Sequence, residues 1–257
     1  MSPLQSENTP VSVCSPRMIF VWLCAVIAGL VCVGAGVEWL DYRYDSPILT
    51  MLDRMFDLDR ESNVPTWVAS SLLLVAGFEL FAVSRTSLPH VERFRGRWVL
   101  LGVLFLLLSL DESARLHERL GVVIAGSATE DTNPLLRNRW VIVYGLGLVP
   151  IAAVYIRFVL ALPGRMGRLM VLAGVVYVGG ALGLEFFESL VQGDGERTAS
   201  AAMFVLTTAQ EALEMLGVAI LIFATRDFKF GKNAAQSVEL VNRDDAGCAK
   251  DEANQVA

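Results

Sequence analysis

The chain is poor in charged residues and in histidine. Asp, Glu, Lys and Arg make up 19% of its 257 residues, and it holds two histidines and four cysteines. The cysteines form no C-x-x-C pair, so the sequence predicts neither a disulfide framework nor a zinc site. It carries no sustained basic stripe, and we therefore expect no nucleic-acid partner. The alternating pattern of a membrane β-barrel is also missing.

Long apolar runs are what the sequence has in abundance. Hydrophobic residues make up 54% of the chain, and the mean hydropathy is +0.51. Several runs approach 20 residues, the length that crosses a hydrocarbon core about 30 Å thick. Because backbone polar groups in lipid must be bonded within their own segment, these runs predict helices. We expect an all-α, polytopic transmembrane helix bundle of about six spans in a lipid bilayer.

The expected boundaries follow from the runs and the polar stretches between them. Residues 1–17 form a polar tail, residues 18–225 form the transmembrane domain, and residues 226–257 form a polar tail that we expect to be disordered. The expected spans are 18–40, 66–84, 98–123, 140–162, 169–191 and 199–225. The apolar core of the first exceeds the ~7–15 residues of a signal peptide, so we expect a retained span.

Two connections carry local signals. Ser46-Pro47 predicts the start of a short amphipathic helix, either on the membrane surface or packed over the end of the bundle. Lys and Arg gather in the second and fourth loops and after the sixth span, whereas the first and fifth loops are acidic. This bias predicts that both termini are cytoplasmic, in a bacterial plasma (inner) membrane. The third loop, with Arg137 and Arg139, departs from the pattern.

Three apolar segments carry acids in pairs. The third span ends in L-D-E-S-A-R-L-H-E-R, the fifth holds L-E-F-F-E, and the sixth holds Q-E-A-L-E-M. Ionisable residues inside a membrane are costly and usually functional. We expect the third helix to continue through its acidic stretch toward Val123, with His117 pointing away from Asp111. Glu79, in the second span, is expected to pair or snorkel near Arg85, and the fifth-span glycines are expected to allow close helix packing.

The acids lie at similar depths. Counted from Arg97, Arg168 and Arg226, the nearest acids of the three spans are 12 to 17 residues along the helix. At 1.5 Å per residue they fall within roughly 8 Å of one level. A second layer, slightly further out, would hold His117, Glu118, Glu188 and Glu38, with hydroxyl groups from Thr207 and Thr208.

The charges of this region do not balance. Its carboxylates are Asp111, Glu112, Glu118, Glu185, Glu188, Glu211 and Glu214, and the basic groups are Arg115, Arg119 and His117. Pairing among them leaves about four carboxylates uncompensated. Buried like charges cannot all ionise, so these groups must share protons, bind cations or face water.

We therefore predict a cation or metal site in the outer half of the bundle. Its expected ligands are Asp111, Glu112, His117, Glu185, Glu188, Glu211 and Glu214, and His117 and Glu118 are the candidate catalytic bases. One histidine among many oxygens suits a divalent metal such as Mn²⁺, Mg²⁺ or Ca²⁺, with iron also considered. The protein would then be a metal-dependent membrane enzyme acting on a lipid or quinone.

Other interpretations of these acids remain open. The same acids could relay charge in a proton- or cation-coupled transporter. They could also pair with a partner in a structural or interaction subunit, or form ordinary ion pairs at a helix end near the headgroups.

Acid pairs with a histidine on several helices resemble di-iron and di-manganese carboxylate bundles. The E-x-x-H signature of those bundles is absent, because Arg115, Gly121, Glu188 and Glu214 stand where histidine is required. The histidine-rich pattern of membrane desaturases and ceramidase-like hydrolases is absent as well. The motifs L-D-E-x-x-x-x-H-E and E-x-L-E-M-x-G resemble those of uncharacterised multi-pass proteins of bacterial inner membranes. That resemblance covers the third and sixth spans and implies no particular activity.

Overall fold

The computed structural model describes residues 15–60, 62–125, 139–191 and 196–255, and within these ranges the chain is helical without strands. The helices in chain order are α1 (Pro16–Tyr44), α2 (Pro47–Phe56), α3 (Val64–Ser84), α4 (Pro89–Arg93), α5 (Arg95–Ala114), α6 (Leu116–Ala125), α8 (Arg139–Leu160), α9 (Gly164–Val178), the π-helical segment η1 (Gly179–Leu184), α10 (Glu185–Val191) and α11 (Glu196–Gln255).

Five helical stretches of the described chain are long and apolar enough to cross a membrane. They are Pro16–Tyr44, Val64–Ser84, Val143–Leu160, Gly164–Glu188 and Ala202–Gly231. Helix α5 has 20 residues, about 30 Å of helix, with arginines at its start and acids at its end. It packs along α3 and completes the bundle. The predicted all-α membrane bundle is confirmed.

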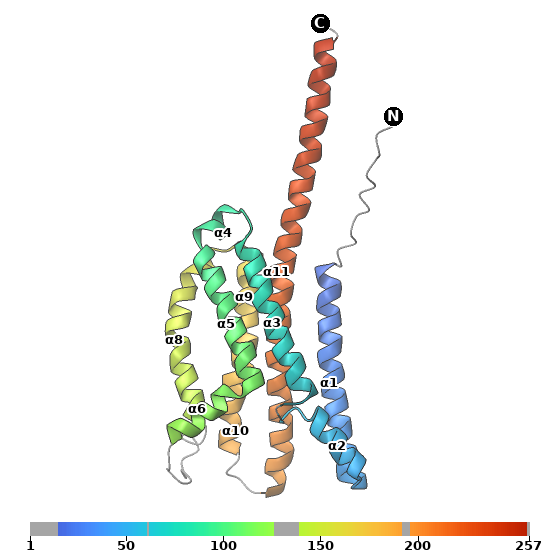
Figure 1. Cartoon of the computed structure of the whole chain (residues 1–257), viewed down its shortest axis with the longest axis vertical. Coiled ribbons are helices and arrows are strands. Elements are labelled where there is room, and N and C mark those ends of the chain that lie inside the picture. The colour runs from blue at the N-terminus through green and yellow to red at the C-terminus, as the bar shows by residue number, and fades with distance from the viewer. Residues whose placement is uncertain (1–14, 61, 126–138, 192–195, 256–257) are drawn as a thin grey trace.

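Figure 1 shows that α1 begins and α11 ends at the same end of the bundle, which is the end that also holds α4. A chain that crosses the membrane an even number of times has both of its ends on the same side. The orientation with both termini in the cytoplasm stays a prediction.

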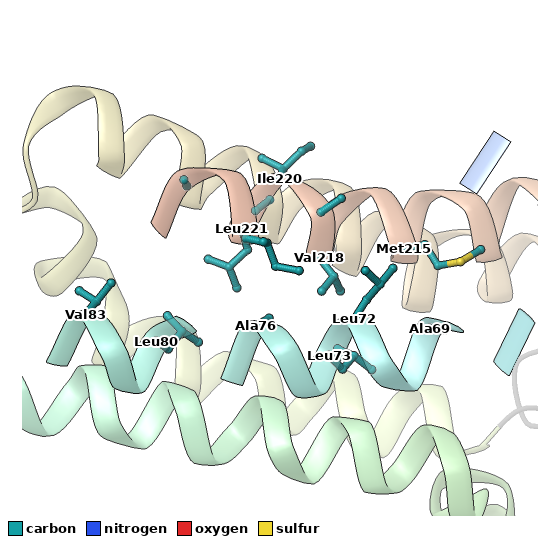
Figure 2. Packing of buried hydrophobic residues seen from close by; sticks show 14 of the residues in the cluster. Ala69, Leu72, Leu73, Ala76, Leu80, Val83, Met215, Val218, Ile220 and Leu221 are labelled. Carbon is teal, nitrogen blue, oxygen red and sulfur yellow. The ribbon is translucent and has the colours of Figure 1, made fainter. Parts of the chain in front are cut away.

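Helices α3 and α11 form the packed core. Half of the apolar stretch of α3 (50%) and 44% of that of α11 are buried, against 6% for α8. In Figure 2 the side chains of Leu72, Ala76 and Leu80 lie between α3 and α11, facing Val218 and Leu221. Because lipid tails are as apolar as leucine, such contacts stabilise the bundle by close packing more than by removal from water.

An ion-pair cluster joins the same two helices near their basic end. Glu79 of α3, with a side chain 10% exposed, binds Arg226 at 2.8 Å and also Lys229, both from α11. The expectation that Glu79 pairs near Arg85 was therefore wrong. The sequence distance to Arg85 was short, but the close packing of α3 against α11 brings two other cations nearer.

Helix α8 is held at both ends. At one end the Phe158 ring packs edge-on against Trp98 with centroids 4.8 Å apart, and the Tyr155 hydroxyl donates to the Arg97 carbonyl at 2.9 Å. At the other end α6 reaches across to α8. The middle of α8 is thus a side wall that packs little against its neighbours.

The third span differs from its prediction. The predicted helix over residues 98–123 breaks at Arg115, which adopts a left-handed conformation (φ 55°, ψ 43°) between α5 and α6. The Arg115 N–H bonds to the Asp111 carbonyl, and the Asp111 side chain accepts the His117 N–H at 2.8 Å. The end of α5 and the start of α6 are both capped by Asp111, so the chain can turn there without glycine.

Two further predictions met different outcomes. Helix α2 begins at Pro47 as predicted, and its outward side chains Ile48 (70% exposed) and Met51 (56% exposed) suit a helix at a membrane surface. The structure extends α11 past residue 226 to Gln255. The tail boundary and its expected disorder stay a prediction.

Candidate functional site

A cavity of about 790 Å³, open over part of its surface, lies between α5, α8, α9–η1–α10 and α11. This volume is within the ~300–1,000 Å³ range of ligand sites. All seven residues predicted as metal ligands line this cavity: Asp111, Glu112, His117, Glu185, Glu188, Glu211 and Glu214. They come from the end of α5, from α6, from α10 and from α11, and α6 and α10 lie at the same end of the bundle in Figure 1.

The corner between α5 and α6 sets the position of the histidine. The Asp111 carboxylate accepts the His117 backbone N–H, and its second oxygen lies 3.4 Å from Nδ1 of the imidazole. The Tyr144 hydroxyl of α8 also hydrogen-bonds to Asp111. Asp111 therefore orients His117 through Nδ1, as carboxylates do for histidines in many metal and catalytic sites.

Side chains of α11 hydrogen-bond to an acid of α10 and to an acid of α11 itself. The Thr207 hydroxyl donates to Oε1 of Glu188 at 2.7 Å, and Glu188 is only 6% exposed. One turn further along α11, the Gln210 side chain hydrogen-bonds to Glu214. Gln210 is 9% exposed, and its Oε1 has no hydrogen-bond partner.

Glycines allow these helices to approach. A Cβ at Gly180 would lie 3.0 Å from the Gln210 carbonyl oxygen, and one at Gly217 would lie 2.7 Å from the Tyr177 backbone nitrogen. The close packing expected of the fifth-span glycines is thus seen at Gly180 but not at Gly174, Gly179 or Gly183, where a Cβ would meet no atom within 4 Å. The π-helical segment η1 widens the turn just before Glu185, a local change often found at functional sites.

The acids of the three helices share one electrostatic environment. Glu214 of α11 interacts with Glu112 of α5 and with Glu185 of α10, and His117 is also in range. The lining holds seven carboxylates, the six predicted and Asp59, but its basic groups are His117 and Arg60. Arg60 is already bound to Asp57 at 2.9 Å. Among the lining residues, carboxylates therefore outnumber basic groups.

No three His, Cys, Asp or Glu side chains among the described residues converge as a metal-ligand set. The donors are carboxylates and one imidazole, a combination that suits a hard cation. The side chain of Glu118, a candidate base, lies outside the described residues. Glu38, Thr208, Arg115 and Arg119 do not line the cavity.

Sequence reasoning missed several lining residues: Asp59, Arg60, Tyr144, Tyr177 and Gln210. A signal existed for Gln210, because it precedes Glu214 by four residues and so shares its helix face. No signal marked the others. Asp59 and Arg60 follow α2 and reach the cavity by the path of the chain, and the tyrosines resemble ordinary packing residues.

The rest of the cavity is apolar. Toward the α4 end it is lined by residues such as Leu101, Phe105, Ile151 and Met170. Between Glu185 and Met170 the lining follows α9 for about 22 Å at 1.5 Å per residue. The cavity therefore has an acidic end and a long hydrocarbon-like end.

The fold and this cavity define an integral membrane protein of the helix-bundle class with an internal, acid-lined chamber. Within that class, the chain belongs to the family described as a domain of unknown function, DUF8692, whose model matches residues 18–227. The match covers most of the helix bundle. No curated protein and no solved structure matches the chain.

Proposed function

We propose that this protein binds a cation at the acidic end of its internal cavity. The observation that supports the proposal is the lining itself, in which acids from α5, α10 and α11 line one cavity together with His117 and Arg60. In a site of low dielectric such carboxylates either share protons or take up positive charge. A chamber of about 790 Å³ favours a bound ligand over closed internal pairing.

The contacts divide the acids by role. Asp111 is engaged in holding His117, and Glu188 accepts from Thr207. We assign the cation to Glu112, Glu185, Glu211 and Glu214 because they line the same cavity from three helices, although each of them also has interactions within the protein. In the metal form of the proposal the ion is Mn²⁺, Mg²⁺, Ca²⁺ or iron, because oxygen ligands dominate.

In the metal form of the proposal, the protein is an enzyme that acts on a lipid or quinone. His117, which Asp111 engages through Nδ1, is its candidate general base. The mostly apolar lining beyond the acids argues against the transporter alternative, since an ion crossing there would meet few polar groups.

Cation binding tests the proposal directly. The purified protein is analysed for metal content and titrated with Mn²⁺, followed by electron paramagnetic resonance, and with methylammonium, followed by thermal stabilisation. Glu211→Gln and Glu214→Gln should each abolish binding. Glu92→Gln is the matched control, because Glu92 is an exposed residue of α4 distant in sequence from the site and pairs only loosely with Arg95 at 3.8 Å.

A saturable site in the wild type and in Glu92→Gln that is lost in both cavity variants supports the proposal. If the wild type binds neither probe and carries no metal, or if the cavity variants bind as the wild type does, the proposal is wrong.

A further inference from the structure

We infer that the corner between α4 and α5 binds the phosphate of an anionic phospholipid in the adjacent membrane leaflet. The inference does not depend on the proposed cation site. Residues 92–97 hold three arginines and one glutamate, so the stretch carries surplus positive charge. Glu92 pairs with Arg95, at 3.8 Å. Within the part of the chain that the structure describes, neither Arg93 nor Arg97 makes an ion pair.

One aromatic ring holds both of these arginines. The guanidinium carbon of Arg93 lies 5.2 Å from the centroid of the Phe94 ring, and that of Arg97 lies 4.9 Å from it. The two positive charges therefore stay within about 10 Å of each other. The ring attracts each cation but supplies no full counter-charge. An anion placed beside the ring is attracted by both guanidinium groups, which bind phosphate through paired N–H donors.

The fold fixes this corner before any ligand arrives. The Phe94 ring packs edge-on against the Phe158 ring of α8, with centroids 5.7 Å apart. Val91, in the preceding turn, is fully buried. The Arg93 side chain is exposed and that of Arg97 is half-buried, so both can be reached from outside the bundle. Because the ring is held on one side by the protein, little order has to be gained on binding.

An outward apolar face of α5 begins next to the arginines. Leu100, Val103 and Leu107 recur at helical spacing and are 54%, 40% and 55% exposed. They do not line the internal cavity, so they face the surrounding lipid. Gly96 continues this face toward α4, and a Cβ there would meet no atom within 4 Å. Acyl chains that lie along this face place a lipid phosphate in the open space at Gly96, beside Arg97.

This layout selects among phosphates. A phospholipid is already confined at the depth of the two arginines, whereas a free phosphate ion gains nothing from the apolar face of α5. Phosphatidylcholine carries its own cation close to the phosphate, and two guanidinium groups repel that cation. Phosphatidylglycerol carries the phosphate charge alone. We therefore expect phosphatidylglycerol to bind in preference to both phosphatidylcholine and inorganic phosphate.

Point variants at the corner test the inference. Arg93→Gln and Arg97→Gln each remove one cation, and Gly96→Asp places a negative charge in the open space. Gly96→Asn is the matched control, since it has nearly the same shape without the charge. A second control is Arg17→Gln, because Arg17 is an exposed arginine at the start of α1, which lies across the bundle from α5 in Figure 1 and packs against α11 and α2.

The purified protein in detergent is titrated with phosphatidylglycerol, phosphatidylcholine and inorganic phosphate. Native mass spectrometry measures the affinity of each bound lipid, and thermal unfolding measures stabilisation at low and at high salt. The melting temperature without lipid shows whether each variant is folded.

Phosphatidylglycerol should bind more tightly than phosphatidylcholine, and its stabilising effect should weaken at high salt. Arg93→Gln and Arg97→Gln should each weaken its binding about fivefold, and Gly96→Asp should weaken it at least as much. Gly96→Asn and Arg17→Gln should bind as the wild type does. Equal weakening by Arg17→Gln would mean a general effect of the basic surface and would overturn the inference. So would equal binding of the two lipids, equal losses in the two Gly96 variants, or inorganic phosphate stabilising the protein as well as phosphatidylglycerol does.

Discussion

Removing the charge of Glu79 should destabilise the bundle far more than removing the charge of an exposed glutamate. Glu79 is 10% exposed and holds two cations of α11, Arg226 and Lys229. Removing one partner of a fully buried pair costs about 3–5 kcal/mol. Arg226 is 36% exposed and Lys229 is 27% exposed, so both keep part of their hydration. We therefore expect about 2 kcal/mol for Glu79→Gln after this discount.

The assay is thermal unfolding in detergent, beside Glu92→Gln. Glu92 and Arg95 are 55% and 53% exposed and 3.8 Å apart, so that control should lose less than about 0.5 kcal/mol. If Arg226 and Lys229 act only through Glu79, neutralising them in the Glu79→Gln background should cost less than it does in the wild type. Equal melting temperatures for Glu79→Gln and Glu92→Gln would refute the idea that this cluster ties α3 to α11.

Three further perturbations have defined outcomes. Thr207→Val removes the hydroxyl that donates to the buried Glu188 carboxylate and should lower stability by about 1–3 kcal/mol in the same assay. Gly217→Ala places a Cβ 2.7 Å from the Tyr177 backbone and should cost about 1–3 kcal/mol, since α9 and α11 must separate. In α2, burial and neighbouring aspartates raise the pKa of Asp53. The folded state thus favours the protonated form of Asp53. Ionised Asp53 lowers the free energy of unfolding above the raised pKa, and this penalty is lost as the pH falls to about 4, near the unperturbed pKa. Asp53→Asn should therefore raise the melting temperature at pH 7.5, by less at pH 4.

Each perturbation has a neighbour for comparison. Thr208→Val makes the same change one residue away, off the cavity lining, and should be nearly neutral. Gly29→Ala should be neutral or stabilising, because its Cβ meets no atom within 4 Å and alanine favours a helix. For Asp53, Arg54 and Arg60 oppose the shift, so a gain in stability for Asp53→Asn that does not depend on pH would contradict the electrostatic explanation.

The helix bundle could be predicted from the sequence because the physical rules for membrane-spanning helices leave few alternatives. Apolar runs of membrane length must be helices, and the spacing of Glu211 and Glu214 places both on one helix face. The shared depth of the acids also needed only the rise per residue and the basic ends of the spans. These local rules were enough to predict that acids of several spans lie at the same depth. All the predicted ligands do line one cavity.

What could not be predicted depends on contacts between segments distant in the sequence. Arg115 adopts a conformation that non-glycine residues rarely take, and no glycine or proline near it announces a break. The break is held by Asp111, which Tyr144 of α8 engages in turn. The apolar half of the cavity was missed for a related reason, since a helix face turned toward a cavity has the same composition as one turned toward lipid.

The break at Arg115 links the chemistry of the cavity to its shape. Along a straight helix His117 would lie about 9 Å beyond Asp111 and on another face, outside the acid layer. The turn brings the imidazole back to Asp111 and into the cavity lining. The same turn directs α6 toward α8 and fixes the acidic end of that wall, while Trp98 and Phe158 fix the other end. A single corner therefore adds a histidine to the acid layer and anchors the wall that closes the apolar chamber, so a change that straightened it would remove both together.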